Sequence, residues 1–226
     1  MNYFEILKTL DELYTELYKQ TLTPTDIAIR IKKKLPFEEV RITTNTTIGI
    51  VDKNFIVSGE YDPEEDEEGQ KCIEIELQFP RHPEEFTFSE KDLTRRHWQN
   101  FAIDIASVLG HEYMHLNQAR ARVFREGKEF SSEMDDETLR GYQEYYGMED
   151  EVDAYAFTLA ASLANDLPDL KTIENAPVYG IYKKVFGDEH AVVKKLENKA
   201  RKYLKILESQ YEEITKNDPD IPPVSK

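Results

Sequence analysis

The period of the hydrophobic pattern changes twice along this chain of 226 residues, and these changes constrain the fold more than any other feature. Up to residue 36, apolar residues recur at helical spacing. Between residues 40 and 80 they alternate with polar residues, as in strands, and from residue 89 the helical spacing returns. The sequence therefore predicts an α+β protein that is mostly helical, with a small antiparallel or mixed sheet before a long helix.

Two helices are predicted in the first 36 residues. The first has an apolar stripe at helical spacing, formed by Tyr3, Leu7, Leu10, Tyr14 and Leu17. The second is predicted to begin at Thr23 and Pro24, a capping residue followed by a proline, and to stop before Pro36.

The alternating region predicts a small, mainly antiparallel sheet with one solvated face. Strands are expected around residues 40–51 and 55–61, on either side of a turn at 52–54. A third strand is expected at Ile73–Phe79, where apolar residues alternate with Glu and Gln. The acidic stretch 62–69 is predicted to be an exposed loop.

Helical spacing dominates the rest of the chain. The long helix is expected over residues 90–126, with Ser89 as its N-cap and Gly127 as its stop. Further helices are expected at 132–146, at 149–166 (ended by Pro168), at 177–186 and at 188–216. Residues 217–226 are expected to form a disordered tail. Because no linker interrupts the pattern, one domain is predicted over residues 1–216, with helices in 1–36, the sheet in 40–80 and the helical part in 89–216.

Charge and cysteine content exclude several classes of protein. Asp and Glu number 45 against 29 Lys and Arg, a formal net charge of −16, which argues against binding to nucleic acid or to anionic membranes. No apolar run approaches the ~18 residues that a membrane span needs. Cys72 is the only cysteine, so no intramolecular disulfide can form, and the first residues lack the pattern of a signal peptide. A cytoplasmic location is predicted.

The segment His111–His115 has the sequence HExxH and lies inside the long predicted helix. Its two histidines are one helical turn apart and face the same point, so together they can hold a divalent ion such as Zn²⁺. Glu112 lies beside them and can accept a proton from water without itself binding the metal. The sequence therefore predicts one zinc ion, with His111 and His115 as ligands and Glu112 as general base.

A third ligand is expected, because catalytic zinc sites normally have three protein ligands and one water. The candidates are the acidic residues Glu149, Asp150, Glu151 and Asp153, near the start of a later predicted helix. Acidic residues are common in a first helical turn, where they interact favourably with the helix dipole. Glu151 is preferred, because it heads a stripe of small residues that would allow close packing. That stripe contains Ala154, Thr158 and Ala161.

The HExxH segment followed by Glu151-x-x-Ala154 resembles the gluzincin zinc metallopeptidases, over roughly residues 70–160. The resemblance implies a zincin-like fold, in which the edge strand of a mixed sheet borders the active-site cleft. It also implies that His111, His115 and Glu151 bind zinc and that Glu112 is the catalytic base.

The chain departs from this family at one position. Many gluzincins have an Asp four residues after the ligand Glu, where it orients a ligand histidine, but this chain has Tyr155. Another group must then hold the histidine, because the partner of a ligand imidazole fixes its tautomer. Asp104 and Asp153 are the candidates.

Peptide hydrolysis also needs a donor for the oxyanion of the transition state. His190 and His97 are candidates, and the sequence does not rank them against the tyrosines nearby. Those tyrosines are Tyr142, Tyr145, Tyr146 and Tyr155.

The predicted function is zinc-dependent hydrolysis of a peptide or protein substrate. Strand Ile73–Leu77 could pair with an extended substrate, and its outward Glu74 and Glu76 would then favour basic peptides. Equally, these charges could serve to discourage edge-to-edge aggregation.

Two alternatives remain open. The chain could be a non-catalytic, acidic interaction protein on a zincin-like scaffold, although such a protein has no need of Glu112. It could also be a deformylase-like amidohydrolase with Cys72 as an upstream metal ligand, although the residues around Cys72 do not match that family.

Overall fold

The computed structural model describes residues 2–35, 37–47, 55–122, 139–165 and 173–217. It is mostly helical with small sheets, which confirms the α+β class. The chain forms two compact units, Met1–Glu112 and Tyr113–Lys226, and the division falls inside helix α4 (Arg95–Ala121). The prediction of one domain stays a prediction.

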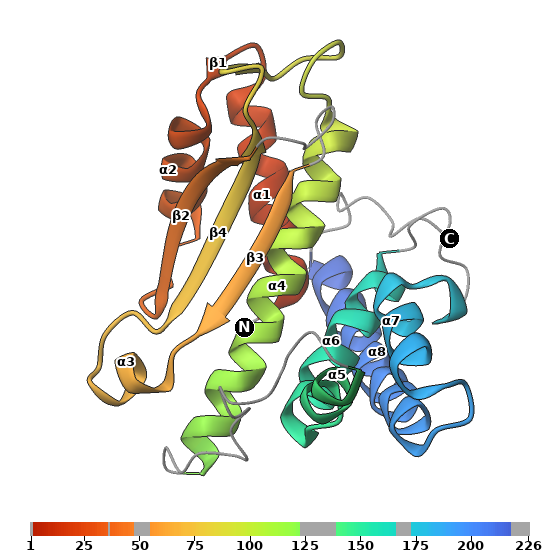
Figure 1. Cartoon of the computed structure of the whole chain (residues 1–226). Coiled ribbons are helices and arrows are strands. Elements are labelled where there is room, and N and C mark those ends of the chain that lie inside the picture. The colour runs from red at the N-terminus through yellow and green to blue at the C-terminus, as the bar shows by residue number, and fades with distance from the viewer. Residues whose placement is uncertain (1, 36, 48–54, 123–138, 166–172, 218–226) are drawn as a thin grey trace. The chain divides into compact units, whose positions relative to one another are not determined.

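The first unit contains helices and short strands in the predicted order (Figure 1). Besides the first part of α4, its elements are α1 (Tyr3–Leu17), β1 (Thr21–Leu22), α2 (Pro24–Lys34), β2 (Val40–Thr47), β3 (Ile56–Tyr61), α3 (Pro63–Glu67), β4 (Ile73–Pro80) and β5 (Phe86–Thr87). The two predicted N-terminal helices are confirmed. Thr23 and Asp26 form a capping box at the start of α2, which explains why the helix begins there.

The main sheet of this unit has the strand order β2-β4-β3. Strand β4 pairs parallel with β2 and antiparallel with β3, so the sheet is mixed rather than mainly antiparallel. Two further strands, β1 and β5, form a small antiparallel pair. The predicted turn at 52–54 lies outside the described residues.

The suggestion that Ile73–Leu77 pairs with substrate is wrong. This segment belongs to β4, which is the central strand and has a hydrogen-bonded neighbour on each side. Its Glu74 is held by Arg41 and Thr43, at 2.7 and 3.0 Å. An alternating pattern identifies a strand with one buried face, but it does not distinguish a central strand from an edge strand.

The acidic stretch after β3 is not only a loop, because it forms the short helix α3. The Asp62 side chain accepts hydrogen bonds from the Glu64 and Glu65 backbone N–H groups, and Pro63 starts the helix. Asp66 is buried and accepts a hydrogen bond from the Tyr61 hydroxyl at 3.0 Å. Acidic residues are favourable in a first helical turn, which accounts for a helix in so acidic a segment.

Helix α4 begins at Arg95, five residues later than predicted. Ser89 does not cap it, because the Ser89 hydroxyl accepts from the Asp92 backbone N–H at 3.1 Å in a preceding turn. At the actual start, the Thr94 hydroxyl accepts from the His97 backbone N–H at 3.4 Å. The described helix ends at Ala121, and the predicted stop at Gly127 lies outside the described residues.

Helix α4 packs on α1 and on β3 within the first unit (Figure 1). The buried Trp98 indole donates to the Leu10 carbonyl at 2.7 Å, which joins α4 to α1. The Trp98 ring also belongs to a cluster of packed aromatic side chains. The other members of this cluster are Tyr14, Phe55, Phe79, Phe86, Phe88 and Phe101. The N-terminal part of α4 is therefore firmly anchored in a hydrophobic core.

Gly59 of β3 lies close to Glu112 of α4. A Cβ added at Gly59 would lie 2.6 Å from Val108 Cγ1 and 2.8 Å from Glu112 Cγ. We therefore expect Gly59→Ala to lower the free energy of unfolding by about 1–3 kcal/mol, because the helix would have to move. Urea denaturation measures this change. Gly180→Ala is the matched control, since a Cβ there meets nothing within 4 Å, and equal midpoints for the two variants would contradict the expectation.

The second unit is helical throughout its described residues. Besides the end of α4, its elements are α5 (Leu139–Tyr146), α6 (Glu149–Ala164), the 3₁₀ turn η1 (Ile173–Asn175), α7 (Pro177–Phe186) and α8 (Ala191–Asn217). The prediction for α7 is confirmed at both ends, and α8 starts three residues later than predicted. Residues 132–138, Pro168 and 218–226, for which predictions were made, lie outside the described residues.

The core of this unit is formed by apolar residues of α6, α7 and α8. Its buried members include Val152, Ala156, Leu159, Tyr179, Tyr182, Val193, Leu196 and Ala200. The apolar stripe of α6 thus packs into the core, and the acidic residues of its first turn are not among the core residues named above. In the described part of the chain, no helix is both long enough and apolar enough to cross a membrane.

Candidate metal centre

Helix α4 presents the two histidines of the HExxH segment from consecutive turns. His111 and His115 are both partly buried, and α4 is a regular helix through this region, as predicted. Glu112 is more deeply buried, with 6% of its surface exposed. The helix therefore supplies two imidazoles on one side and a protected carboxylate beside them.

Glu151, in the first turn of α6, completes a group of three possible ligands. One ligand atom from each of His111, His115 and Glu151 lies within 4.8 Å of the other two. His115 Nε2 is 3.5 Å from Glu151 Oε1. That separation is close to the ~3.4 Å edge of a tetrahedron with metal–ligand bonds of about 2.1 Å. The group could hold a metal ion, and two imidazoles with one carboxylate suit zinc.

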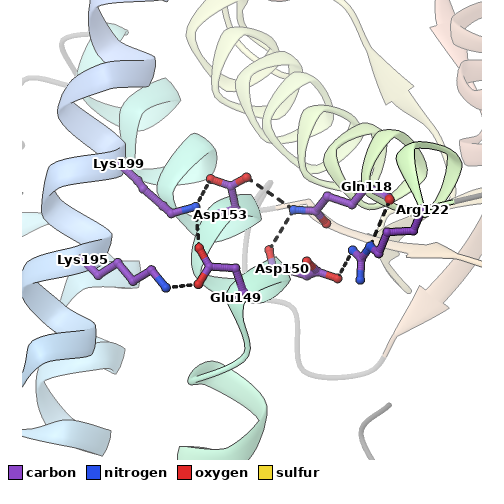
Figure 2. A network of polar contacts seen from close by, with 7 residues as sticks. All are labelled: Gln118, Arg122, Glu149, Asp150, Asp153, Lys195 and Lys199. Carbon is purple, nitrogen blue, oxygen red and sulfur yellow. Dashed lines mark hydrogen bonds and ion pairs between the residues drawn. The ribbon is translucent and has the colours of Figure 1, made fainter. Parts of the chain in front are cut away.

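The other acidic residues at the start of α6 are engaged by cations, as Figure 2 shows. Glu149 forms ion pairs with Lys195 and, at 3.0 Å, with Lys199. Asp150 pairs with Arg122, and Asp153 pairs with Lys199 at 2.8 Å. Of the four carboxylates that the sequence offered, the structure brings Glu151 to the histidines.

The electrostatics of Glu151 favour a nearby cation. Burial raises the pKa of the Glu151 carboxyl to about 7, although a hydrogen bond from Tyr145 acts in the opposite direction. Burial also lowers the pKa of His115, so this imidazole is neutral near pH 7, as a metal ligand must be. A divalent ion bound beside this buried carboxylate would favour its ionised form.

Metal affinity should therefore depend on pH. Below about pH 7 a proton occupies Glu151 and competes with the metal, whereas above this pH the carboxylate is ionised. We expect zinc affinity to fall about tenfold for each pH unit below 7 from this group alone, and to level off above 7.5. Competition titrations with a chromophoric chelator between pH 5.5 and 8.5 measure this dependence. A constant affinity across that range would contradict it.

Tyr145 of α5, one of the predicted oxyanion donors, lies beside the candidate ligand Glu151. Its hydroxyl hydrogen-bonds the Glu151 carboxylate, and burial raises the pKa of Tyr145 above its usual value, so the hydroxyl keeps its proton. Tyr155 hydrogen-bonds Tyr145, and its pKa is also raised by burial. Both can therefore act as neutral donors.

The other predicted donors have different contacts. The exposed His190 stacks on Phe186, with ring centroids 5.0 Å apart, and its Nδ1 accepts from the Val192 backbone N–H at the start of α8. His97 contacts Thr94 in the first turn of α4, about 21 Å along the helix from His111. The structure brings neither of them into the group of three ligands.

Asp104 and Asp153, the candidate partners of a ligand histidine, are placed differently. Asp104 is exposed on α4, about 10 Å along the helix axis from His111, which is beyond direct hydrogen-bonding distance. Asp153 contacts Gln118 at 3.5 Å, and Gln118 in turn contacts His115 at 3.2 Å. Sequence reasoning missed Gln118. Its position three residues after His115, on the same helical face, was the available signal.

Comparisons with known proteins do not extend this picture. No family model matches the chain, no curated protein matches its sequence, and no solved structure matches its fold. Cys72, the ligand required by the deformylase alternative, is completely buried before β4 and is not part of the group of three. The class of protein must therefore be argued from the chemistry of the site.

Proposed function

We propose that the protein is a zinc-dependent peptidase of the gluzincin type. One observation carries the proposal, the convergence of His111, His115 and Glu151 within 4.8 Å. The position of Glu112, buried and next to His111 in the chain, supports hydrolysis over simple metal storage. Two histidines, one carboxylate and an adjacent base are the usual components of a hydrolytic zinc site.

Each residue then has a separate chemical role. When bound, Zn²⁺ would lower the pKa of a water ligand and polarise the scissile carbonyl. Glu112 accepts the proton of that water and delivers it to the leaving amine. The Tyr145 hydroxyl, which donates its one hydrogen to Glu151, would stabilise the developing oxyanion by exchanging this bond for one to the substrate.

The packing around Glu112 supports its role as the base. Glu112 Oε1 lies 2.9 Å from the place where a Cβ of Gly59 would be, so only glycine at this position leaves room for the carboxylate. A buried carboxylate that is not a metal ligand, and for which the sheet makes space, is well placed to move protons.

An extended peptide is the proposed substrate. β3 lies at an edge of the sheet formed by the described strands, and Gly59 of β3 lies close to Glu112. A peptide added to this edge would lie close to the base. The exposed Glu60 on β3 and the net charge of −16 favour basic peptides.

The direct test is to measure zinc content and peptide cleavage in the same preparation. We expect about one zinc per chain by elemental mass spectrometry. We also expect cleavage of a diverse peptide mixture, detected as new peptide termini, that stops with a chelator and returns with zinc. Bound zinc without cleavage would favour the non-catalytic interaction protein, and absence of zinc binding would overturn the proposal.

A further inference from the structure

The Gln118 side chain contacts both the candidate ligand His115 and the first turns of α6. Figure 2 shows its contacts with Asp150 and Asp153 of α6. Its Oε1 is 3.2 Å from His115 Nδ1. Its Nε2 is 3.4 Å from the Asp150 carbonyl oxygen and 3.5 Å from Asp153 Oδ2. All of these residues belong to the second unit.

The partners of Gln118 determine which way its amide points. The Asp150 carbonyl oxygen can only accept a hydrogen bond, so the Gln118 NH₂ group must face it, and this group then also faces Asp153 Oδ2. The amide oxygen is then left for His115, and it too can only accept. Therefore His115 Nδ1 must carry the hydrogen of this bond.

A lysine of α8 holds the Asp153 carboxylate in place beside Gln118. Lys199 Nζ is 2.8 Å from Asp153 Oδ1 and 3.0 Å from Glu149, while Lys195 pairs with Glu149 (Figure 2). Lys199 thus occupies Oδ1 of Asp153, and the other carboxylate oxygen, Oδ2, faces the Gln118 amide.

We propose that Gln118 is a positioning residue that holds His115 in the tautomer with hydrogen on Nδ1. Nε2 then carries the free lone pair, and Nε2 is the atom that lies 3.5 Å from Glu151 Oε1. The imidazole is thus prepared for a metal before any metal binds. The tautomer follows from the hydrogen bonds alone, whereas its use as a prepared ligand rests on the proposed function.

The test uses the full chain, free of metal and labelled with ¹⁵N-histidine. Two-bond ¹H–¹⁵N NMR spectra at pH 8 distinguish the two neutral tautomers of His115. We expect the Nδ1–H form in the wild-type protein and a shift towards the Nε2–H form in Gln118→Met. Gln143→Met is the matched control, because Gln143 of α5 donates to the Val185 carbonyl of α7 at 3.0 Å; it should leave the tautomer unchanged.

Zinc affinity gives a second, separate readout. Loss of a group that orients a metal ligand typically weakens binding 10–100-fold, so we expect this loss for Gln118→Met and none for Gln143→Met. An Nε2–H tautomer in the wild-type protein would overturn the proposal, even if the variant failed to fold. So would an unchanged tautomer in a folded Gln118→Met. A wild-type protein that shows the Nδ1–H form and binds no zinc would overturn the proposed function and leave the positioning role supported.

Discussion

Glu112→Gln is expected to reduce peptide hydrolysis by about 10²–10⁴-fold, the usual contribution of a general base. Glutamine has nearly the same shape, so it should fit the space beside Gly59 without moving α4. It cannot accept a proton from water, however. Because Glu112 is not among the three grouped ligands, the zinc content should stay at the wild-type level.

Measuring activity and metal content together distinguishes a role of Glu112 as base from a role as metal ligand. Initial rates on one cleaved peptide and zinc per chain are measured on the same samples. Glu208→Gln is the control, because Glu208 is an exposed residue of α8 and its replacement makes the same change of charge. Wild-type rates in Glu112→Gln would exclude the mechanism. Loss of zinc in this variant would instead indicate that Glu112 binds the metal.

Glu151→Gln is expected to have two opposite effects. Zinc affinity should fall by at least about 10²-fold, because the only anionic ligand of the group is lost. The metal-free protein should nevertheless become more stable at pH 8, by about 1–3 kcal/mol. A buried carboxylate destabilises the fold when it is ionised, because burial removes it from water, and glutamine removes that charge.

The expected gain in stability follows from the difference between the pKa values of Glu151 in the folded and unfolded chain. Its carboxyl has a pKa of about 7 in the folded chain and about 4.5 when unfolded, so between these values the folded state holds more protons. Stability of the metal-free protein therefore falls as the pH rises from 4.5 to 7. The gain from Glu151→Gln should be full above pH 7 and should shrink towards pH 4.5.

Urea denaturation of the metal-free proteins at pH 5 and pH 8 measures this difference. Glu149→Gln is the matched control, since Glu149 is 60% exposed and already paired with lysines. It should bring no gain in stability at either pH. A gain for Glu151→Gln that is equal at pH 5 and pH 8 would contradict the electrostatic explanation.

Local signals allowed much of the fold and site to be predicted. Pro24 and its capping threonine located the start of α2, and α7 spans 177–186 as predicted. The one-turn spacing of His111 and His115 needs only a regular helix. Glu151 could be preferred because small residues follow it on one face of α6.

What could not be predicted depends on contacts between distant segments. The alternation in β4 did not reveal that this strand lies between β2 and β3, because a strand's position in a sheet depends on its partners. The role of Gln118 was hidden for the same reason, since Asp150 and Asp153, which orient its amide, come from another helix. Helix α3 is different, because Asp62 and Pro63 carried a local signal that the acidic composition obscured.

The ion pairs of α8 bear on how much of the chain a working fragment must contain. The family resemblance covers roughly residues 70–160, and a fragment cut to those limits would retain His111, His115 and Glu151. It would lack Lys195 and Lys199, the counter-charges of Glu149 and Asp153. The first turns of α6 would then carry uncompensated negative charge, so the shortest fragment with an intact site has to extend through α8.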